Sequence, residues 1–264
     1  MRTDLVIKEY VKQKRSAAKR VLWIGVIGLY DKGELMVSEE YVFVPVGKNK
    51  KVSGIISVPD NFQYGENPGV IIAHGAGNGM FHPLLVHMAN VLAETGYLCM
   101  RFNFLYRDEE RKSPDGEGVL EATWVNVCQF LKDHPVYKPS SIVAAGKSLG
   151  GRIASQVIAE GYMNVKGLIF LGYPLHASGK KDQLKDAHLY RLKTPMLFFA
   201  GSKDPFCDID ELRKVLARID APCILDVIDG GNHSFKPPAS AGISEQQVYA
   251  RILGSILSWL KTVR

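Results

Sequence analysis

The chain has no long hydrophobic run. None of its apolar stretches approaches the roughly 20 consecutive residues that a membrane-spanning helix needs, so we predict no membrane span. The hydrophobic fraction of 46% is ordinary for a globular protein, and a chain of 264 residues can bury a sizeable core without disulfides or metals. We therefore expect a soluble globular protein of one or two domains.

Cysteines are few, and no two of them form a C-x-x-C motif, which excludes the common zinc and thioredoxin-type patterns. Cys99 and Cys128 lie in apolar patterns that indicate buried core thiols. The histidines and acidic residues show no metal-ligand spacing, so we expect neither a metal nor another cofactor. Because nothing requires an oxidising compartment, we expect a cytoplasmic protein.

The chain carries almost no net charge outside the N-terminal segment. The net charge is +6, but residues 1–20 hold seven Lys and Arg residues against two acidic ones, so the remainder is nearly neutral. This distribution argues against a nucleic-acid-binding surface. A charge-rich segment of this kind is typical of a solvated chain end, or of a contact with anionic lipid or another chain.

Residues 21–30 are apolar and follow the basic segment, an order that is also found in signal peptides. The basic part is unusually long, however, and no small-x-small cleavage site follows. We therefore favour a packed strand or helix here over an exported protein. We predict that residues 1–38 form an N-terminal extension of unknown role, and that residues 39–264 form the main domain.

The main domain alternates between short apolar runs and amphipathic segments. Residues 39–58 suit two strands joined by a turn at 47–50. Further strands are predicted from six runs, each of which lacks strict alternation, as strands buried on both faces do: Val70–Ala73, Tyr97–Met100, Ile142–Ala145, Leu168–Leu171, Met196–Ala200 and Ile224–Ile228. We predict an α/β fold, with a mostly parallel central sheet flanked by helices on both faces.

Helical periodicity fills the gaps between these runs. Residues 84–92 form one amphipathic pattern, with Pro83 before it and Gly96 after it, and residues 120–131 form a second. The spacing of Asp208 with Glu211, and of Ser244 with Gln247, predicts two capping boxes that open later helices.

The run that ends at Ala145 leads directly into a G-x-S-x-G motif at Gly146, Ser148 and Gly150. In a strand–turn–helix context this motif predicts a nucleophilic serine on a sharp turn. Glycines beside Ser148 remove Cβ atoms that would collide, and the following helix directs its positive end at the developing anion. A glycine-rich turn without catalysis is the alternative.

Two later strands are followed by the partners that a serine nucleophile needs. Asp204 follows the run that ends at Ala200, and His233 follows the run that ends at Ile228. Carboxyl ends of parallel strands share one edge of a sheet, so these side chains can converge on Ser148. Histidine would take the serine proton and the carboxylate would orient the imidazole. Asp208 and Asp229 are rival candidates for the acid.

The loop His74–Gly79 follows the first buried strand and is rich in small residues. We predict that the backbone N–H groups of Ala76 and Leu149 form an oxyanion hole, with Gly77 as a further substrate-binding candidate. A phosphate-binding loop is the alternative, but no Lys-Ser or Lys-Thr pair follows the glycines as a Walker motif requires.

The chain resembles the α/β-hydrolase superfamily, and more narrowly its small dienelactone-hydrolase-like branch, over roughly residues 50–262. The resemblance rests on His74–Gly77, Arg101–Phe104, Gly146–Arg152, Gly172–His176, Asp204–Phe206 and Gly231–Lys236. It implies a hydrolase fold and a triad of Ser148, Asp204 and His233. It says little about the substrate, and it also raises a role as a non-catalytic interaction module.

The interval between the fourth and fifth of these buried strands is short. Only 23 residues separate Gly172 from Thr194 inclusively, so we expect a small lid or none. Tyr173 and His176 are candidate substrate-binding residues there, with turn packing as the alternative.

The predicted function is cleavage of a small carboxylic ester through an acyl-enzyme. Thioesterase, peptidase and acyltransferase reactions remain open because all use the same intermediate. The predicted partner is a small-molecule ester or acyl substrate, and the oligomeric state is not predicted.

Overall fold

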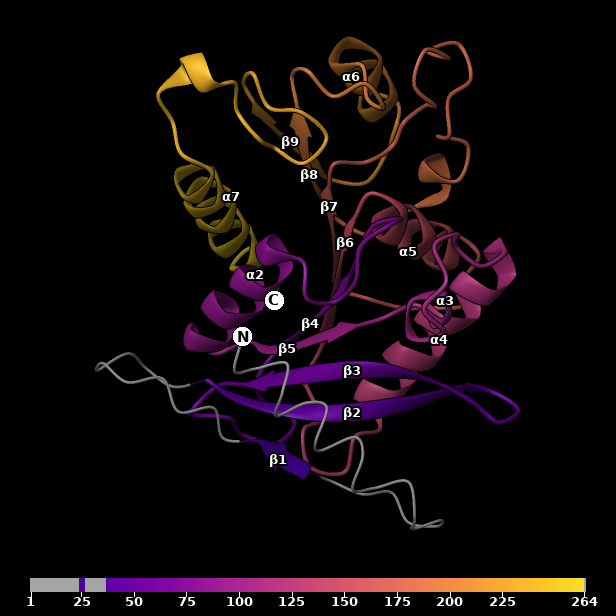
Figure 1. Cartoon of the computed structure of the whole chain (residues 1–264), viewed down its shortest axis with the longest axis vertical. Helices are drawn as coiled ribbons and strands as arrows, with labels where there is room; N and C mark the ends of the chain where they lie inside the picture. Colours follow the sequence, from indigo (N-terminus) through magenta and orange to yellow (C-terminus); the bar gives the residue numbers. More distant parts are fainter. Residues whose placement is uncertain (1–23, 27–36, 264) are drawn as a thin grey trace.

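A computed structural model describes residues 24–26 and 37–263, and within these residues one sheet of nine strands forms the centre of the protein (Figure 1). The strand order is β1-β2-β3-β5-β4-β6-β7-β8-β9, antiparallel from β1 to β5 and parallel from β5 to β9. The strands are β1 (Ile24–Val26), β2 (Ser38–Gly47), β3 (Lys50–Val58), β4 (Gly69–Ala73), β5 (Leu98–Phe102), β6 (Ile142–Lys147), β7 (Gly167–Leu171), β8 (Met196–Gly201) and β9 (Cys223–Ile228). The predicted mostly parallel sheet is confirmed.

Helices cover both faces of the sheet, and each face has its own apolar core (Figure 1). One face carries α2 (Pro83–Glu94) and α7 (Glu245–Leu260). The other carries α3 (Leu105–Asp108), α4 (Glu117–Lys132), α5 (Leu149–Ala159) and α6 (Ile209–Leu216). Short 3-10 turns span Leu189–Arg191 and Ala239–Ala241.

Strand β6 contributes side chains to both apolar cores. Its alternate side chains Ile142 and Ala144 face the α4 and α5 core, whereas Val143 and Ala145 face the α2 and α7 core. Because both sets are apolar, the strand appears in the sequence as a continuous hydrophobic run.

Strand β5 extends beyond its predicted end. The apolar run stops before Arg101, but the strand continues to Phe102. The Arg101 side chain is only 1% exposed, forms an ion pair with Glu39 and donates a hydrogen bond to the carbonyl oxygen of Met80 at 3.3 Å. These partners compensate for the buried charge, so an arginine is accommodated inside the strand.

One of the two predicted capping boxes is confirmed and the other is wrong. Ser244 and Gln247 form the reciprocal pair at the start of α7. Asp208 caps α6 by accepting hydrogen bonds from Asp210 and Glu211, but the reciprocal bond is missing. The Asp208 backbone N–H, which Glu211 would accept, donates instead to His176 Nε2 at 3.0 Å.

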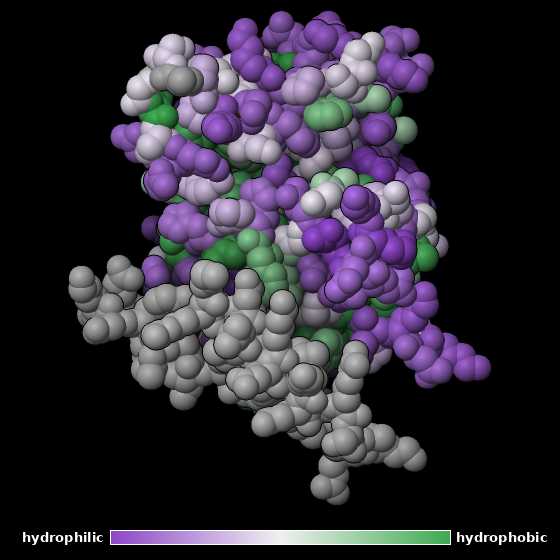
Figure 2. Space-filling model, in the orientation of Figure 1, coloured by the Kyte–Doolittle hydropathy of each residue, from purple (hydrophilic) through white to green (hydrophobic). Residues whose placement is uncertain are grey.

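Most of the predicted N-terminal extension, residues 1–23 and 27–36, lies outside the described residues. Strand β1 pairs antiparallel with Glu39–Tyr41 of β2. None of the helices described is both long enough and apolar enough to cross a membrane. On the face shown in Figure 2, hydrophilic side chains cover most of the coloured surface and apolar ones are scattered.

Candidate functional site

Ser148 occupies a sharp turn between β6 and α5. It is the N-cap residue of α5, with φ of 49° and ψ of −115°, a region that residues other than glycine rarely adopt. Its backbone N–H donates to the carbonyl oxygen of Leu171 at 3.1 Å, and its own carbonyl oxygen accepts from Arg152 at 3.1 Å. The turn is therefore fixed on both sides, and it leaves the serine side chain partly exposed.

The two glycines of the motif allow this turn to pack. A Cβ atom at Gly146 would lie 2.2 Å from the backbone nitrogen of Gly151, and one at Gly150 would lie 2.6 Å from the carbonyl oxygen of His74. Neither distance is compatible with a side chain, so α5 can approach β6 and β4 this closely only where glycine is present.

Ser148, His233 and Asp204 form a continuous chain of hydrogen bonds. The Ser148 Oγ lies 2.8 Å from His233 Nε2, and His233 Nδ1 lies 2.7 Å from Asp204 Oδ2. A carboxylate only accepts, so Nδ1 carries the proton toward Asp204, and Nε2 of the neutral ring is left to accept the serine proton. The structure brings together the three residues that the motif spacing selected.

Asp204 is held firmly in this arrangement. Its side chain is fully buried, and Oδ1 accepts the backbone N–H of Phe206 at 2.8 Å. The Phe206 ring packs edge-on against the His233 ring, with centroids 4.8 Å apart. The loop of Asp204 is joined to the loop of His233 by a bond from the Lys203 N–H to the carbonyl oxygen of Gly231 at 2.9 Å.

The rival acids are engaged elsewhere. Asp208 caps α6 and pairs with Lys181, whose Nζ lies 2.6 Å from Oδ2. Asp229 accepts hydrogen bonds from the Ser202 hydroxyl and the Gly230 N–H, both at 3.0 Å. The geometry therefore favours Asp204 as the partner of His233.

The loop after β4 lies beside the serine. A Cβ atom at Gly75 would lie 3.3 Å from the Ser148 Cβ, so Ala76 and Gly77 follow within a short distance of the nucleophile candidate. Leu149 is the first residue of α5, where backbone N–H groups lack partners within the helix. The Tyr106 hydroxyl donates to the carbonyl oxygen of Gly75 at 3.5 Å, so Ala76 and Gly77 remain the candidates beside Leu149.

A buried histidine fixes the conformation of this loop, a role for which no local sequence signal exists. His74 is fully buried; its Nδ1 donates to the carbonyl oxygen of Gly75 at 2.8 Å and its Nε2 accepts the Phe104 N–H at 3.1 Å. Burial lowers the pKa of His74 to about 4, so the ring is neutral at neutral pH and can serve as donor and acceptor at once.

Tyr173 and His176 do not line an open site, which corrects the prediction that they bind substrate. Each side chain is 1% exposed. The Tyr173 hydroxyl donates to the carbonyl oxygen of Lys185 at 2.5 Å, and the His176 ring nitrogens bond to Ala177 and Asp208. With their polar atoms occupied by the protein, both residues serve to pack the segment that follows β7.

The segment from 172 to 195, where a lid would be inserted, contains a single 3-10 turn and no α-helix. Its side chains Leu175, Leu189 and Leu192 are buried in the core shared with α4 and α5, and His188 Nε2 lies 2.8 Å from the Ser155 Oγ of α5. The segment is therefore bound to α5, as expected for a protein with a small lid or none.

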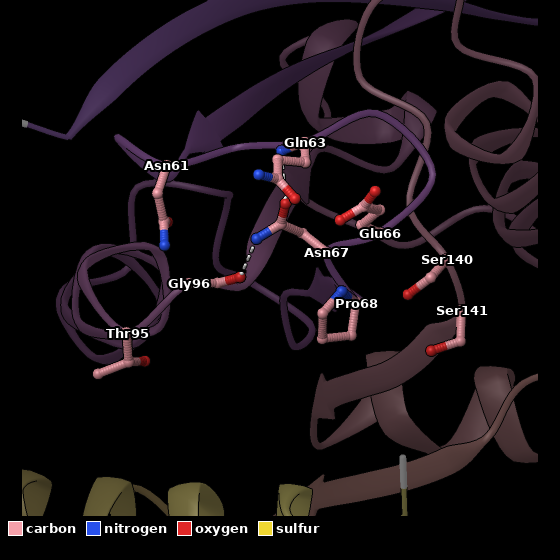
Figure 3. Close-up of a pocket in the computed structure, with 9 residues that line it drawn as sticks. All are labelled: Asn61, Gln63, Glu66, Asn67, Pro68, Thr95, Gly96, Ser140 and Ser141. Atoms are coloured by element: carbon pink, nitrogen blue, oxygen red, sulfur yellow. Dashed lines mark hydrogen bonds between the residues drawn. The ribbon is translucent and has the colours of Figure 1, made fainter.

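A polar pocket of about 510 Å³ lies at the amino ends of the parallel strands, opposite to the end that carries Ser148 (Figure 3). Its wall includes Pro68, Gly96 and Ser141, which directly precede or lead into β4, β5 and β6. Figure 3 shows Asn67 bridging Gln63 and Gly96 across it. Ser148 follows the carboxyl end of β6, so this pocket is separate from the serine site.

Within residues 24–26 and 37–263, no group of three or more His, Cys, Asp or Glu side chains could hold a metal ion.

Comparisons with known proteins agree with this geometry. A family model described as an alpha/beta hydrolase domain matches residues 66–261. The dienelactone hydrolase of Anabaena variabilis superposes with a TM-score of 0.69 at 22% identity, over 85% of this chain and 97% of that one. A serine hydrolase without lid from Xanthomonas campestris gives 0.62 at 16% identity, over 85% and 94%. At these identities the two structures show a shared fold.

A curated protein of Mycobacterium tuberculosis, whose name assigns it provisionally to the phosphoribosyl transferases, is 25% identical over 193 residues. The match covers 72% of this chain but 42% of that protein. The chain therefore spans less than half the length of this relative.

Proposed function

Because the chain belongs to the α/β-hydrolase family, we propose that it is a serine hydrolase that cleaves a small carboxylic ester through an acyl-enzyme. The observation that carries the proposal is the unbroken hydrogen-bond chain from Ser148 through His233 to Asp204, with distances of 2.8 and 2.7 Å. A serine hydroxyl is a weak nucleophile at neutral pH, and a base within hydrogen-bond reach activates it.

In the first half of the reaction, His233 Nε2 takes the proton of the Ser148 hydroxyl while Oγ bonds to the ester carbonyl carbon. The N–H groups of Leu149 and Ala76 stabilise the oxygen that becomes negative, and the buried carboxylate of Asp204 stabilises the imidazolium. The bond from carbon to the alkoxy oxygen then breaks, and His233 returns its proton so that an alcohol leaves.

In the second half, water replaces the alcohol. His233 takes one proton from the water as its oxygen attacks the acyl carbon, and the bond to Ser148 Oγ breaks. His233 then returns that proton to Oγ, which releases a carboxylic acid and restores the free serine.

A small substrate is supported by the short segment between β7 and β8. It contains one 3-10 turn and is packed against α5, so it supplies no helical lid to enclose a long acyl chain. Thioesterase, peptidase and acyltransferase reactions use the same acyl-enzyme and differ in the leaving group or the acceptor. Most of the mycobacterial relative lies outside the match, so its name gives no support for a transferase reaction in this chain.

The test is an assay of the purified chain with p-nitrophenyl esters of increasing acyl length, beside Ser148→Ala. We expect turnover of short esters by the wild type and a loss of about 10⁴-fold or more in the variant. A Ser148→Ala variant that hydrolyses the esters at a rate close to that of the wild type would contradict a role for Ser148 as nucleophile. A preference for long chains would refute the assignment to small esters.

A further inference from the structure

The residue between Gly146 and Ser148 is a buried lysine. Lys147 is the last residue of β6 and is only 2% exposed. Its Nζ donates a hydrogen bond to the carbonyl oxygen of His233 at 3.1 Å and lies 5.9 Å from the centre of the Phe235 ring. The side chain therefore runs from the turn that carries Ser148 to the loop that carries His233.

Lys147 also lies beside the third loop of the site. A Cβ atom at Gly75, in the loop after β4, would lie 3.3 Å from the Lys147 carbonyl oxygen and 3.7 Å from its Cγ. One side chain thus donates to the loop after β9 and runs beside the loop after β4, while its own backbone leads into Ser148. No other residue of the G-x-S-x-G motif has a side chain long enough to do so.

The ammonium group has little electrostatic compensation. Within the described residues it forms no salt bridge; the charged or titratable groups that act on it are Asp204 from the loop after β8 and His82 from the loop before α2. Burial lowers the pKa of Lys147 to about 8, with Asp204 opposing the shift. An apolar side chain of the same length would avoid this desolvation cost, so the lysine is unfavourable for stability alone.

We propose that Lys147 is a positioning residue, which holds the backbone of the His233 loop so that Nε2 stays within hydrogen-bond reach of Ser148 Oγ. The inference rests on the proposed function for its kinetic consequence, but its structural consequence can be measured in an inactive protein. A displacement of the imidazole by about 1 Å is enough to lower turnover about 100-fold.

The variant Lys147→Met keeps the length of the side chain and removes its charge and donor. We expect kcat to fall by between about 10- and 100-fold with little change in KM, because the substrate contacts are intact. The melting temperature at pH 7 should be unchanged or higher, since the buried charge is gone. Lys132→Met is the matched control: it removes a bond from a lysine Nζ to a carbonyl oxygen, that of Asn164 at 3.0 Å, remote from Ser148.

A proton NMR signal gives a readout that does not depend on turnover. The His233 Nδ1–H bound to Asp204 should resonate far downfield, and its loss in His233→Ala assigns it. We expect the signal to shift or broaden in Lys147→Met and to persist in Lys132→Met. An unchanged signal, an unchanged kcat, or a Lys147→Met protein that fails to fold would each overturn the positioning role. If the wild type lacks esterase activity but the signal still changes in Lys147→Met, only the proposed function is rejected and the positioning role of Lys147 stands.

Discussion

Ser148 has a backbone conformation that serine seldom adopts, and the surrounding structure compensates for it. A residue with φ of 49° in this region costs on the order of 1–3 kcal/mol. Hydrogen bonds to Leu171 and from Arg152 hold the backbone, and the hydroxyl is directed at His233. Strain that is held in place at a partly exposed hydroxyl agrees with a role as nucleophile.

The proposed role of Asp204, and not Asp208, as the acid partner of His233 can be tested by substitution. We expect Asp204→Asn to lower kcat/KM by about 10³- to 10⁴-fold, because an amide cannot keep the imidazole in the correct tautomer or stabilise its charged form. Asp208→Asn is the matched control, since asparagine also caps helices. Steady-state kinetics of the two variants decide: a large loss in Asp208→Asn, or none in Asp204→Asn, would refute the assignment.

The position of Ser148 depends on the close packing of α5 against the end of β6. At Gly146 the helix backbone leaves no room for a side chain, whereas Gly254 in α7 is exposed and a Cβ atom there would meet nothing within 4 Å. The same substitution should therefore have opposite effects at these two positions.

We expect Gly146→Ala to lower the free energy of unfolding by about 3 kcal/mol or more, because the added methyl group forces β6 and α5 apart. Gly254→Ala should raise the free energy of unfolding by about 0.5–1 kcal/mol and leave esterase activity unchanged. Urea denaturation measures both effects. A Gly146→Ala protein as stable as the wild type would show that the turn is less tightly packed than described.

Within the residues that the structure describes, burial lowers the pKa of three histidines far enough to keep them neutral well below pH 6. Burial lowers the pKa of His74, His134 and His188 to about 4 in each case. In the unfolded chain a histidine takes up a proton near pH 6.5, so between about pH 6.5 and 4 the unfolded state binds more protons than the folded state. The free energy of unfolding must therefore fall as the pH falls through this window.

His74 should contribute the clearest part of this acid sensitivity, roughly 3 kcal/mol between pH 6.5 and 4, since its side chain is fully buried. We expect His74→Gln to be less stable than the wild type at pH 7 but to lose less stability on acidification. Urea denaturation at several pH values measures the slope. Parallel slopes for the two proteins would contradict a buried neutral His74.

The alternation of apolar runs and helical patterns predicted the parallel sheet correctly, because strands buried on both faces are hydrophobic throughout. Motif spacing selected Ser148, Asp204 and His233, which the fold brings together. What the sequence could not predict depends on contacts between distant segments: the extension of β5 through Arg101, the link from Lys147 to His233, and the burial of Tyr173 and His176. Each of these needs a partner at least 30 residues away or a packed segment around it, which no local pattern encodes.

Activation of Ser148 by His233 can be measured with a fluorophosphonate probe. An activated serine attacks the phosphorus, so that an Oγ–P bond forms and fluoride leaves, without any need to know the natural substrate. Mass spectrometry of the labelled protein should place one adduct on Ser148 in the wild type and none in His233→Ala. No adduct on the folded wild type, or equal labelling of Ser148 in His233→Ala, would show that His233 does not activate Ser148.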